Sequence, residues 1–234
     1  MKKFKRLIII PAKSFSSRIK KKNFKNFLGK PIILYSYEAA KKSKIFDRIH
    51  ISTESILIQK KMKSFNISID FLREKKLTKP KVGIFEVYKQ TLLRYNKLGI
   101  DFEEIWGLLP CSPLIDSGDL LSINKKIIKK KINLPLITVS KFPSPVEWAF
   151  EKRRNNKLKP LDIKSFMLPS QKIKQKYFDV GNLCIFSKKN LIQNNAKTIL
   201  SKYYGYELPR EKSVDIDNID DWQFAKLMKK KTNC

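Results

Sequence analysis

Cysteine is scarce in this chain, and long apolar runs are absent. Three cysteines occur among 234 residues, at Cys111, Cys184 and Cys234, with no Cys-x-x-Cys spacing. An odd number of widely separated cysteines argues against both a disulfide framework and a zinc site. No apolar stretch approaches the roughly 18 residues of a transmembrane helix, and the apolar run before Pro11 is too short for a signal peptide. We therefore expect a cytoplasmic protein with reduced cysteines.

Acidic residues are few compared with basic ones. The chain has 51 lysines and arginines against 21 aspartates and glutamates, which gives a formal net charge of +30. Such a charge is typical of proteins that bind nucleic acids. However, only eight of the basic residues are arginine, the side chain preferred for bidentate phosphate and base contacts, and the lysines are spread along nearly every segment. This distribution favours a solvated lysine surface over a nucleic-acid-binding face.

Two glycine-rich phosphate-binding motifs are missing, because neither G-x-x-x-x-G-K-[ST] nor G-x-G-x-x-G occurs. Instead, an apolar run at residues 7–10 leads through Pro11 into a loop of small and cationic residues. A strand followed by such a loop is one way in which α/β proteins bind phosphate. On this stretch alone, a phosphate site and a solvated basic loop both remain open. The polar side chains that the loop offers to such a ligand include Lys13, Ser14, Ser16, Ser17, Arg18 and Lys22.

Short apolar runs alternate with amphipathic patterns through most of the chain. The alternation predicts an α/β fold with a mainly parallel sheet, and the length suits a single domain over residues 1–234. The predicted strands lie at residues 6–10, 48–52, 67–71, 104–109, 134–140 and 182–186. The predicted helices lie at residues 31–43, 55–65, 83–99, 117–131 and 218–231.

The regular alternation stops at residue 141 and resumes near residue 178. Four prolines interrupt every pattern in this stretch, and residues 151–159 resemble the tip of a hairpin. We expect residues 141–178 to form a small excursion from the sheet.

Two further stretches carry candidate functional residues. In "SVDIDNIDDW" (residues 213–222), Asp215 and Asp217 project to the same side if Ile216 turns into the core. Two such carboxylates can share a hard cation such as Mg²⁺, although capping aspartates are also common. In "LLPCSPLIDSGDL" (residues 108–120), a strand breaks before a helix, either as an ordinary cap or as a turn that lines the same cleft as the first loop.

Together these stretches resemble the acylneuraminate cytidylyltransferases, the CMP-sialic acid synthetase family. "IPAKSFSSRIKKKN" (10–23) and "GKP" (29–31) resemble the family's opening I-P-A-R-x-G-S-K-R-I-P-x-K-N and G-K-P. "ISTE" (51–54) resembles V-S-T-D, and "PCSPL" (110–114) resembles P-T-[SA]-P-L. "DIDNIDDW" (215–222) resembles the late D-I-D before a helix. The ordered set spans nearly the whole chain.

Within the family, the excursion is most similar to pseudaminic acid cytidylyltransferases. "TVSKFPSPVEWAF" (138–150), "PSQ" (169–171) and "YFDVGNLCIF" (177–186) resemble S-V-T-x-F-P-x-P-I-x-x-A, R-S-Q and Y-x-D-A-G-Q-F. The resemblance implies a Rossmann-like, doubly wound sheet of the nucleotide-diphospho-sugar transferase type, with dimerisation and sugar binding at residues 141–178. It also implies an enzyme that uses CTP to convert a nine-carbon acidic sugar, such as pseudaminic acid, into a CMP-sugar and pyrophosphate.

The resemblance further implies roles for individual residues and a homodimer. The reaction needs little acid–base machinery, because the sugar's anomeric hydroxyl attacks the α-phosphate while the protein positions the substrates and neutralises phosphate charge. The implied roles are catalysis for Lys22 and Arg18; nucleotide binding for Lys13, Ser16, Asn23, Arg73 and Ser112; sugar binding for Ser170, Gln171, Asp179 and Asn182; and Mg²⁺ binding for Asp215 and Asp217.

Several positions depart from the family pattern, and they leave alternatives open. One is a weakened or altered activity, and another is a cytidylyltransferase for a different acidic keto sugar, such as sialic acid or Kdo. A third is a non-catalytic relative that binds nucleic acid or another polyanion. The departures are Lys13 in place of arginine, Ser14 and Phe15 in place of glycine, Ser17 in place of lysine, Pro169 in place of arginine, and "TKPKVG" (78–83) in place of a D-D-x-T-like stretch.

Overall fold

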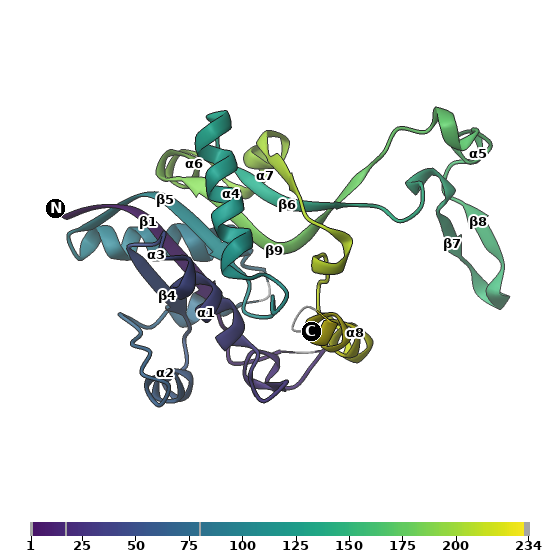
Figure 1. Ribbon diagram of the computed structural model, residues 1–234. Coiled ribbons are helices and arrows are strands. Elements are labelled where there is room, and N and C mark those ends of the chain that lie inside the picture. Colours follow the sequence, from purple (N-terminus) through teal and green to yellow (C-terminus); the bar gives the residue numbers. More distant parts are fainter. Residues whose placement is uncertain (1, 17, 80, 232–234) are drawn as a thin grey trace.

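A six-stranded sheet organises the computed structural model, which describes residues 2–16, 18–79 and 81–231 (Figure 1). Its strand order is β10-β6-β9-β5-β1-β4. β1 pairs in parallel with β4 and β5, β10 pairs in parallel with β6, and β9 runs antiparallel to both of its neighbours. The mainly parallel α/β sheet predicted from the sequence is therefore confirmed. The strands are β1 (Lys2–Pro11), β4 (Arg48–Ser52), β5 (Ile100–Leu108), β6 (Leu136–Lys141), β9 (Tyr177–Ser187) and β10 (Tyr204–Glu207).

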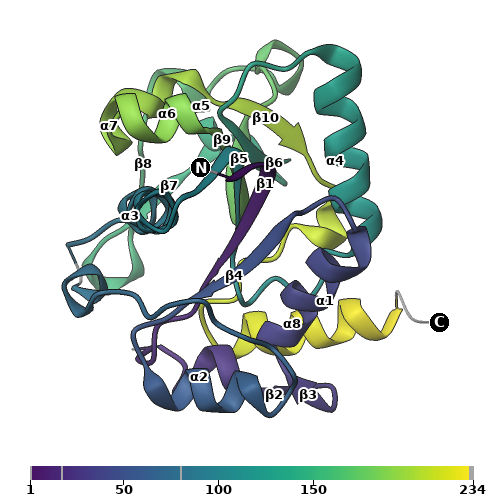
Figure 2. The same cartoon turned by 90° about the vertical axis from the view of Figure 1, so that its left-hand side faces the viewer.

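Helices cover both faces of this sheet (Figure 2). α1 and α4 pack on one face, whereas α3, α6 and α7 pack on the other. α2 packs beside α1, and α8 packs over the loop that follows β1. The helices are α1 (Ile33–Ser43), α2 (Ile56–Lys63), α3 (Ile84–Lys97), α4 (Ser117–Lys130), α6 (Lys188–Gln193), α7 (Ala196–Ile199) and α8 (Ile219–Lys231).

The apolar run of β1 is continuous because both of its faces are buried. Ile8 packs in the cluster of α1 and α4, while Leu7 and Ile9 pack in the cluster of α3, α6 and α7. Successive strand residues point to opposite faces, so a strand covered on both sides has no polar alternation. This burial fixes the end of β1 at Pro11, where the cationic loop begins.

One predicted strand is absent from the structure, and one strand of the structure was not predicted. Residues 67–71 form no strand, because Ile67 and Ile69 bury their side chains against Ile58 and Met62 of α2 instead of joining the sheet edge. The alternating apolar pattern is thus satisfied by packing on a helix. Conversely, β10 was not predicted, since its sequence Tyr-Gly-Tyr-Glu is short and contains glycine.

The segment between β6 and β9 extends away from the sheet (Figure 1). It contains a hairpin of β7 (Phe150–Lys152) and β8 (Leu158–Pro160), followed by the short helix α5 (Ile163–Phe166). None of residues 141–178 is buried within its own chain. The exposed large apolar side chains here are Trp148, Phe150, Leu158, Leu161, Ile163, Met167, Leu168 and Tyr177.

The only histidine, His50, lies in the core and not in a pocket. Its Nδ1 is 3.1 Å from Tyr95 Oη, and Tyr95 donates its hydroxyl hydrogen to Asp70. Since Tyr95 has only that one hydrogen to give, Nδ1–H of His50 is the donor in the first contact. The pKa of His50 is lowered to about 4, mainly by burial; the charge of Asp70 opposes this shift, and the charges of Arg48 and Arg73 add to it.

We expect His50 to make the protein less stable in mild acid. The unfolded chain takes up a proton near its ordinary pKa of 6.5, but the folded chain does so only near pH 4. Stability is therefore present above pH 6.5 and is lost as the pH falls towards 4, by up to about 3 kcal/mol. Urea unfolding of wild type and His50→Leu at pH 7 and pH 4.5 should show a stability difference that depends on pH. A constant difference would contradict this assignment.

Candidate active site

A pocket of about 320 Å³ lies where β1 and β5 end. These neighbouring strands are parallel, so the loops that follow them meet at the same edge of the sheet, as in other α/β folds. The first loop, the turn after β5, residues of β9 and the segment before α8 all contribute to the lining. The pocket brings together nine of the predicted site residues: Lys13, Ser16, Arg18, Lys22, Asn23, Arg73, Ser112, Asn182 and Asp215.

Asn23 holds the first loop in shape. It is buried, and its Nδ2 donates to the carbonyl of Lys13 at 3.0 Å. Its Oδ1 accepts a hydrogen bond from Cys111 Sγ at 3.5 Å, in the turn that follows β5. Both ends of the amide are thus engaged within the protein. Asn23 therefore shapes the pocket by joining the loop to the neighbouring strand end.

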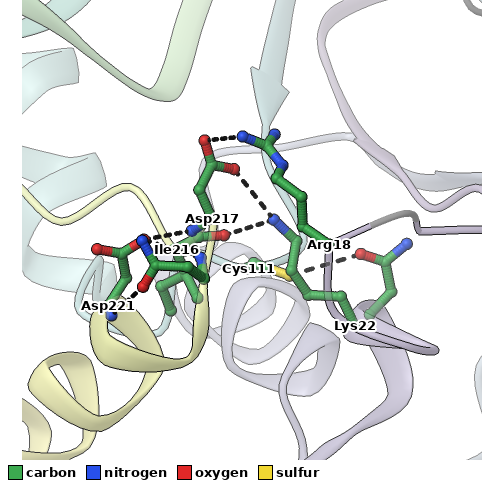
Figure 3. A network of polar contacts seen from close by, with 8 residues as sticks. Arg18, Lys22, Cys111, Ile216, Asp217 and Asp221 are labelled. Atoms are coloured by element: carbon green, nitrogen blue, oxygen red, sulfur yellow. Dashed lines mark hydrogen bonds and ion pairs between the residues drawn. The ribbon is translucent and has the colours of Figure 1, made fainter. Parts of the chain in front are cut away.

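The cations of the first loop meet the carboxylate of Asp217 (Figure 3). Arg18 donates to Asp217, and Lys22 Nζ lies 3.7 Å from the other oxygen of the same carboxylate. Lys22 also donates to the carbonyl of Ile216. These contacts join two segments that lie near opposite ends of the sequence. They also place Asp217 directly beside the pocket, although it is not part of the lining.

The capping of α8 fixes the backbone at Asp217. Asp221 accepts hydrogen bonds from the backbone N–H groups of Asp217 and Asn218 at 2.8 and 2.9 Å (Figure 3). In return, Asn218 Oδ1 accepts from the N–H groups of Asp220 and Asp221. Reciprocal contacts of this kind satisfy N–H groups that have no partner within a helix. Asp221 therefore fixes the backbone before α8 through hydrogen bonds, in addition to placing a negative charge in the first turn of that helix.

Asp215 and Asp217 have the arrangement that their spacing predicted. Ile216 between them is buried with Trp222, so the two carboxylates lie on the side away from that core. Partial burial and the charge of Asp217 raise the pKa of Asp215, whereas Lys22 and Arg18 lower it. Mg²⁺ takes one or two protein carboxylates together with phosphate oxygens. The pair fits such an ion, and no larger group of metal ligands occurs in the parts of the chain that the structure describes.

The pairing of β9 is irregular where its residues line the pocket. The pairing of β9 with β6 shifts register between Ile137 and Val139, and Gly181 has a φ of +70°, which favours glycine. The next residue, Asn182, lines the pocket and accepts a hydrogen bond from Thr138 at 2.5 Å. Asp179 accepts from the N–H of Gly181 but does not line the pocket.

The predicted sugar-binding residues are divided between two places. Asn182 lies in the pocket, whereas Ser170 and Gln171 lie on the excursion and are exposed. Ser170 instead lines a smaller hollow formed by the excursion itself. Within one chain, the structure therefore does not bring Ser170 and Gln171 to the pocket.

Sequence reasoning missed one wall of the pocket. It is formed by the turn before α3 and by the start of that helix, and the only sign of it was the altered motif "TKPKVG". Ser17, whose missing positive charge was noted in the sequence, lies outside the described residues. The wall residues are Leu77, Thr78, Lys79, Val82, Ile84 and Val87.

Comparisons with known proteins find relatives both in sequence and in structure. A family model described as cytidylyltransferase matches residues 7–98. The chain is 29% identical to the pseudaminic acid cytidylyltransferase of Campylobacter jejuni, over 97% of both chains. The chain is therefore similar to cytidylyltransferases over nearly its whole length. It is also 27% identical to the N-acylneuraminate cytidylyltransferase of Escherichia coli, over 97% of this chain and 52% of that one.

A third relative of the chain is the CMP-N,N'-diacetyllegionaminic acid synthase of Legionella pneumophila, which is 25% identical over 95% of both chains. Among solved structures, a CMP:2-keto-3-deoxy-manno-octonic acid synthetase complexed with CTP superposes with a TM-score of 0.71. The superposition covers 98% of this chain and 100% of that one at 13% identity, so it shows the fold. The resemblance read from the sequence motifs is confirmed.

Proposed function

We propose that this protein is a cytidylyltransferase that transfers CMP from CTP to a nine-carbon acidic sugar and releases pyrophosphate. Pseudaminic acid or a related nonulosonic acid is the proposed acceptor, in keeping with what the relatives' names state. The observation that carries the proposal is the meeting of Arg18 and Lys22 with Asp217 at the edge of the pocket. Cations facing carboxylates across a strand-end pocket suit a polyphosphate bound together with a divalent ion.

The chain's own residues would act by positioning and by neutralising charge. The anomeric hydroxyl of the sugar attacks the α-phosphorus of CTP, and the bond from that phosphorus to the β-phosphate oxygen breaks, so pyrophosphate leaves. Lys13, Arg18 and Lys22 would hold the phosphate oxygens and offset their charge during the transfer. In the structure, Asp217 already contacts two of these cations, so an entering triphosphate competes with this carboxylate for them.

We propose Mg²⁺ as the cofactor, held by Asp215 and Asp217. When bound, it would supply positive charge to the phosphate oxygens and the attacking hydroxyl. Ser16, Arg73 and Ser112 would contact the nucleotide from the pocket lining, while Asn23 would shape the loop around it. On the sugar side, the proposed residues are Ser170, Gln171, Asp179 and Asn182.

The alternatives from the sequence are tested by the same assay. They are another acidic keto sugar as acceptor, and a relative that binds a polyanion without catalysis.

We also propose a cytoplasmic location, where CTP is available. The described part of the chain contains no helix that is long and apolar enough to cross a membrane.

The function is tested by measuring pyrophosphate release with each of the four nucleoside triphosphates and a panel of acidic sugars. We expect release with CTP and pseudaminic acid or another nonulosonic acid, and at most one per cent of that rate, roughly, with ATP, GTP or UTP. Turnover with Kdo alone would show that the acceptor is Kdo and not a nonulosonic acid. Binding of polyanions without any turnover would contradict the enzymatic proposal.

The two carboxylates give a second prediction. Asp215→Asn and Asp217→Asn should each lower Mg²⁺-dependent pyrophosphate release by roughly a hundredfold or more, because a charge contact to the reacting phosphate is lost. CTP binding without metal should persist in Asp217→Asn, since Arg18 and Lys22 are released from the carboxylate. Asp220→Asn is the matched control, because Arg18 and Lys22 pair with Asp217 and not with Asp220. Near wild-type turnover in both variants would remove the metal assignment.

We further propose that the excursion joins two copies of the chain. Its apolar side chains are exposed, and Leu161 and Met167 are 67% and 76% accessible. Clustered apolar side chains on an arm that buries nothing of its own are typical of an interface. Pairing through this arm would bring Ser170 and Gln171 of one copy towards the pocket of the other.

Sedimentation at micromolar concentration should therefore show a dimer. Leu161→Asp together with Met167→Asp should shift it to the monomer, because each new charge would be buried at the interface. Leu57→Asp on α2 is the control, as Leu57 is 78% exposed and lies far from the arm in sequence. A monomeric wild type would overturn the proposal.

A further inference from the structure

Glu54 lies behind the pocket and connects two parts of its lining. It follows β4, and neither Glu54 nor Ser14 is among the lining residues. Glu54 Oε1 accepts hydrogen bonds from Ser14 N and Ser14 Oγ at 2.8 and 2.6 Å. Its other oxygen, Oε2, accepts from Arg73 Nη2 at 2.8 Å. One carboxylate thus spans from the first loop to the guanidinium of Arg73.

The bridge is largely shielded from water. The side chains of Arg73 and Glu54 are 5% and 12% exposed. Burial alone would raise the pKa of Glu54, but the hydrogen bonds from Ser14 and Arg73 outweigh burial and lower it. Glu54 is therefore ionised at neutral pH, and its contacts are charge-assisted hydrogen bonds, which are stronger than neutral ones.

Arg73 has few other constraints on its guanidinium. Its backbone N–H donates to the carbonyl of Thr53 at 2.7 Å, which fixes the main chain only. The Nε of Arg73 is buried and has no hydrogen-bond partner among the described residues. Since Arg73 lines the pocket, the contact with Glu54 sets the direction in which its remaining donors point.

Both donors of Ser14 and both carboxylate oxygens of Glu54 take part in this bridge. The hydroxyl of Ser14 supplies a second donor beside its backbone N–H, and Glu54 uses one carboxylate oxygen for Ser14 and the other for Arg73. The start of the first loop is therefore tied to Arg73 through a single carboxylate.

We propose that Glu54 is a positioning residue that holds the first loop and Arg73 as one unit around the nucleotide. Ser14 directly follows Lys13, so the bridge sets the phosphate-binding start of the loop relative to Arg73. This inference rests on the proposed function, because the unit has a purpose only if one ligand touches both parts. Fixed spacing of two contact groups lowers the entropy lost on binding.

The test compares Glu54→Gln with Glu104→Gln. Glu104 makes a matched ion pair with Arg6, at 2.8 Å and with 9% and 14% exposure, and it also accepts from Trp106. This pair is not part of the pocket lining. Both variants should lower the melting temperature. Only Glu54→Gln should speed hydrogen exchange at the Ser14 amide, by about tenfold, and raise the CTP dissociation constant by about tenfold.

Steady-state kinetics and a milder variant complete the test. The KM for CTP should rise in Glu54→Gln more than kcat falls, because the ligand is held less well. Ser14→Ala removes only the hydroxyl contact at an exposed position, so it should fold and should raise the CTP dissociation constant by about threefold. If Glu54→Gln does not fold, the exchange and binding of Ser14→Ala decide the proposal.

Two outcomes would overturn the proposal. The first is that Glu54→Gln matches Glu104→Gln in Ser14 exchange and in CTP binding, which makes Glu54 a structural ion pair only. The second is that the exchange of the Ser14 amide is the same in Glu54→Gln as in wild type, while wild type itself binds no CTP. Absence of CTP binding in wild type contradicts the proposed function, whereas the exchange of Ser14 measures the bridge independently of any ligand.

Discussion

The contact between the first loop and the segment before α8 is the interaction on which the pocket depends. Arg18 pairs with Asp217, but Arg18 is 64% exposed, and an exposed ion pair contributes roughly 0–1 kcal/mol. The anchoring comes from apolar burial, because Trp222 packs edge-on against Phe27 at 5.4 Å and Ile216 is buried beside them. Burial thus joins the two segments, and the ion pair selects which side chains face each other.

Much of the sheet could be predicted because its signals are local. A strand buried on both faces appears as an unbroken apolar run, as in β1, and residues 48–52 form β4 as predicted. Residues 67–71 show where such signals fail, since Ile67 and Ile69 alternate like a strand but pack against α2. Alternation reports that side chains are buried on one side, and tertiary structure decides which neighbour buries them.

The candidate site also combines features set by local sequence with features set by tertiary structure. The common side of Asp215 and Asp217 follows from the burial of one residue between them, so their spacing was sufficient to predict it. Glu54 could not be found in this way, because its partner Ser14 lies 40 residues away and the contact depends on how β4 and β1 pair. Ser170 and Gln171 are harder still, as their surroundings in one chain leave them exposed.

The first loop keeps three cations at the pocket, Lys13, Arg18 and Lys22, although serine replaces lysine at position 17. Phe15 is 72% exposed at the pocket edge, so its side chain occupies no buried space in the loop. Arg18 and Lys22 both reach Asp217, which shows that their positive ends converge on one point beside Asp215. A triphosphate entering there would face two carboxylates as well as the cations. Under the proposed function, the divalent ion would therefore supply the positive charge needed between phosphate and carboxylate.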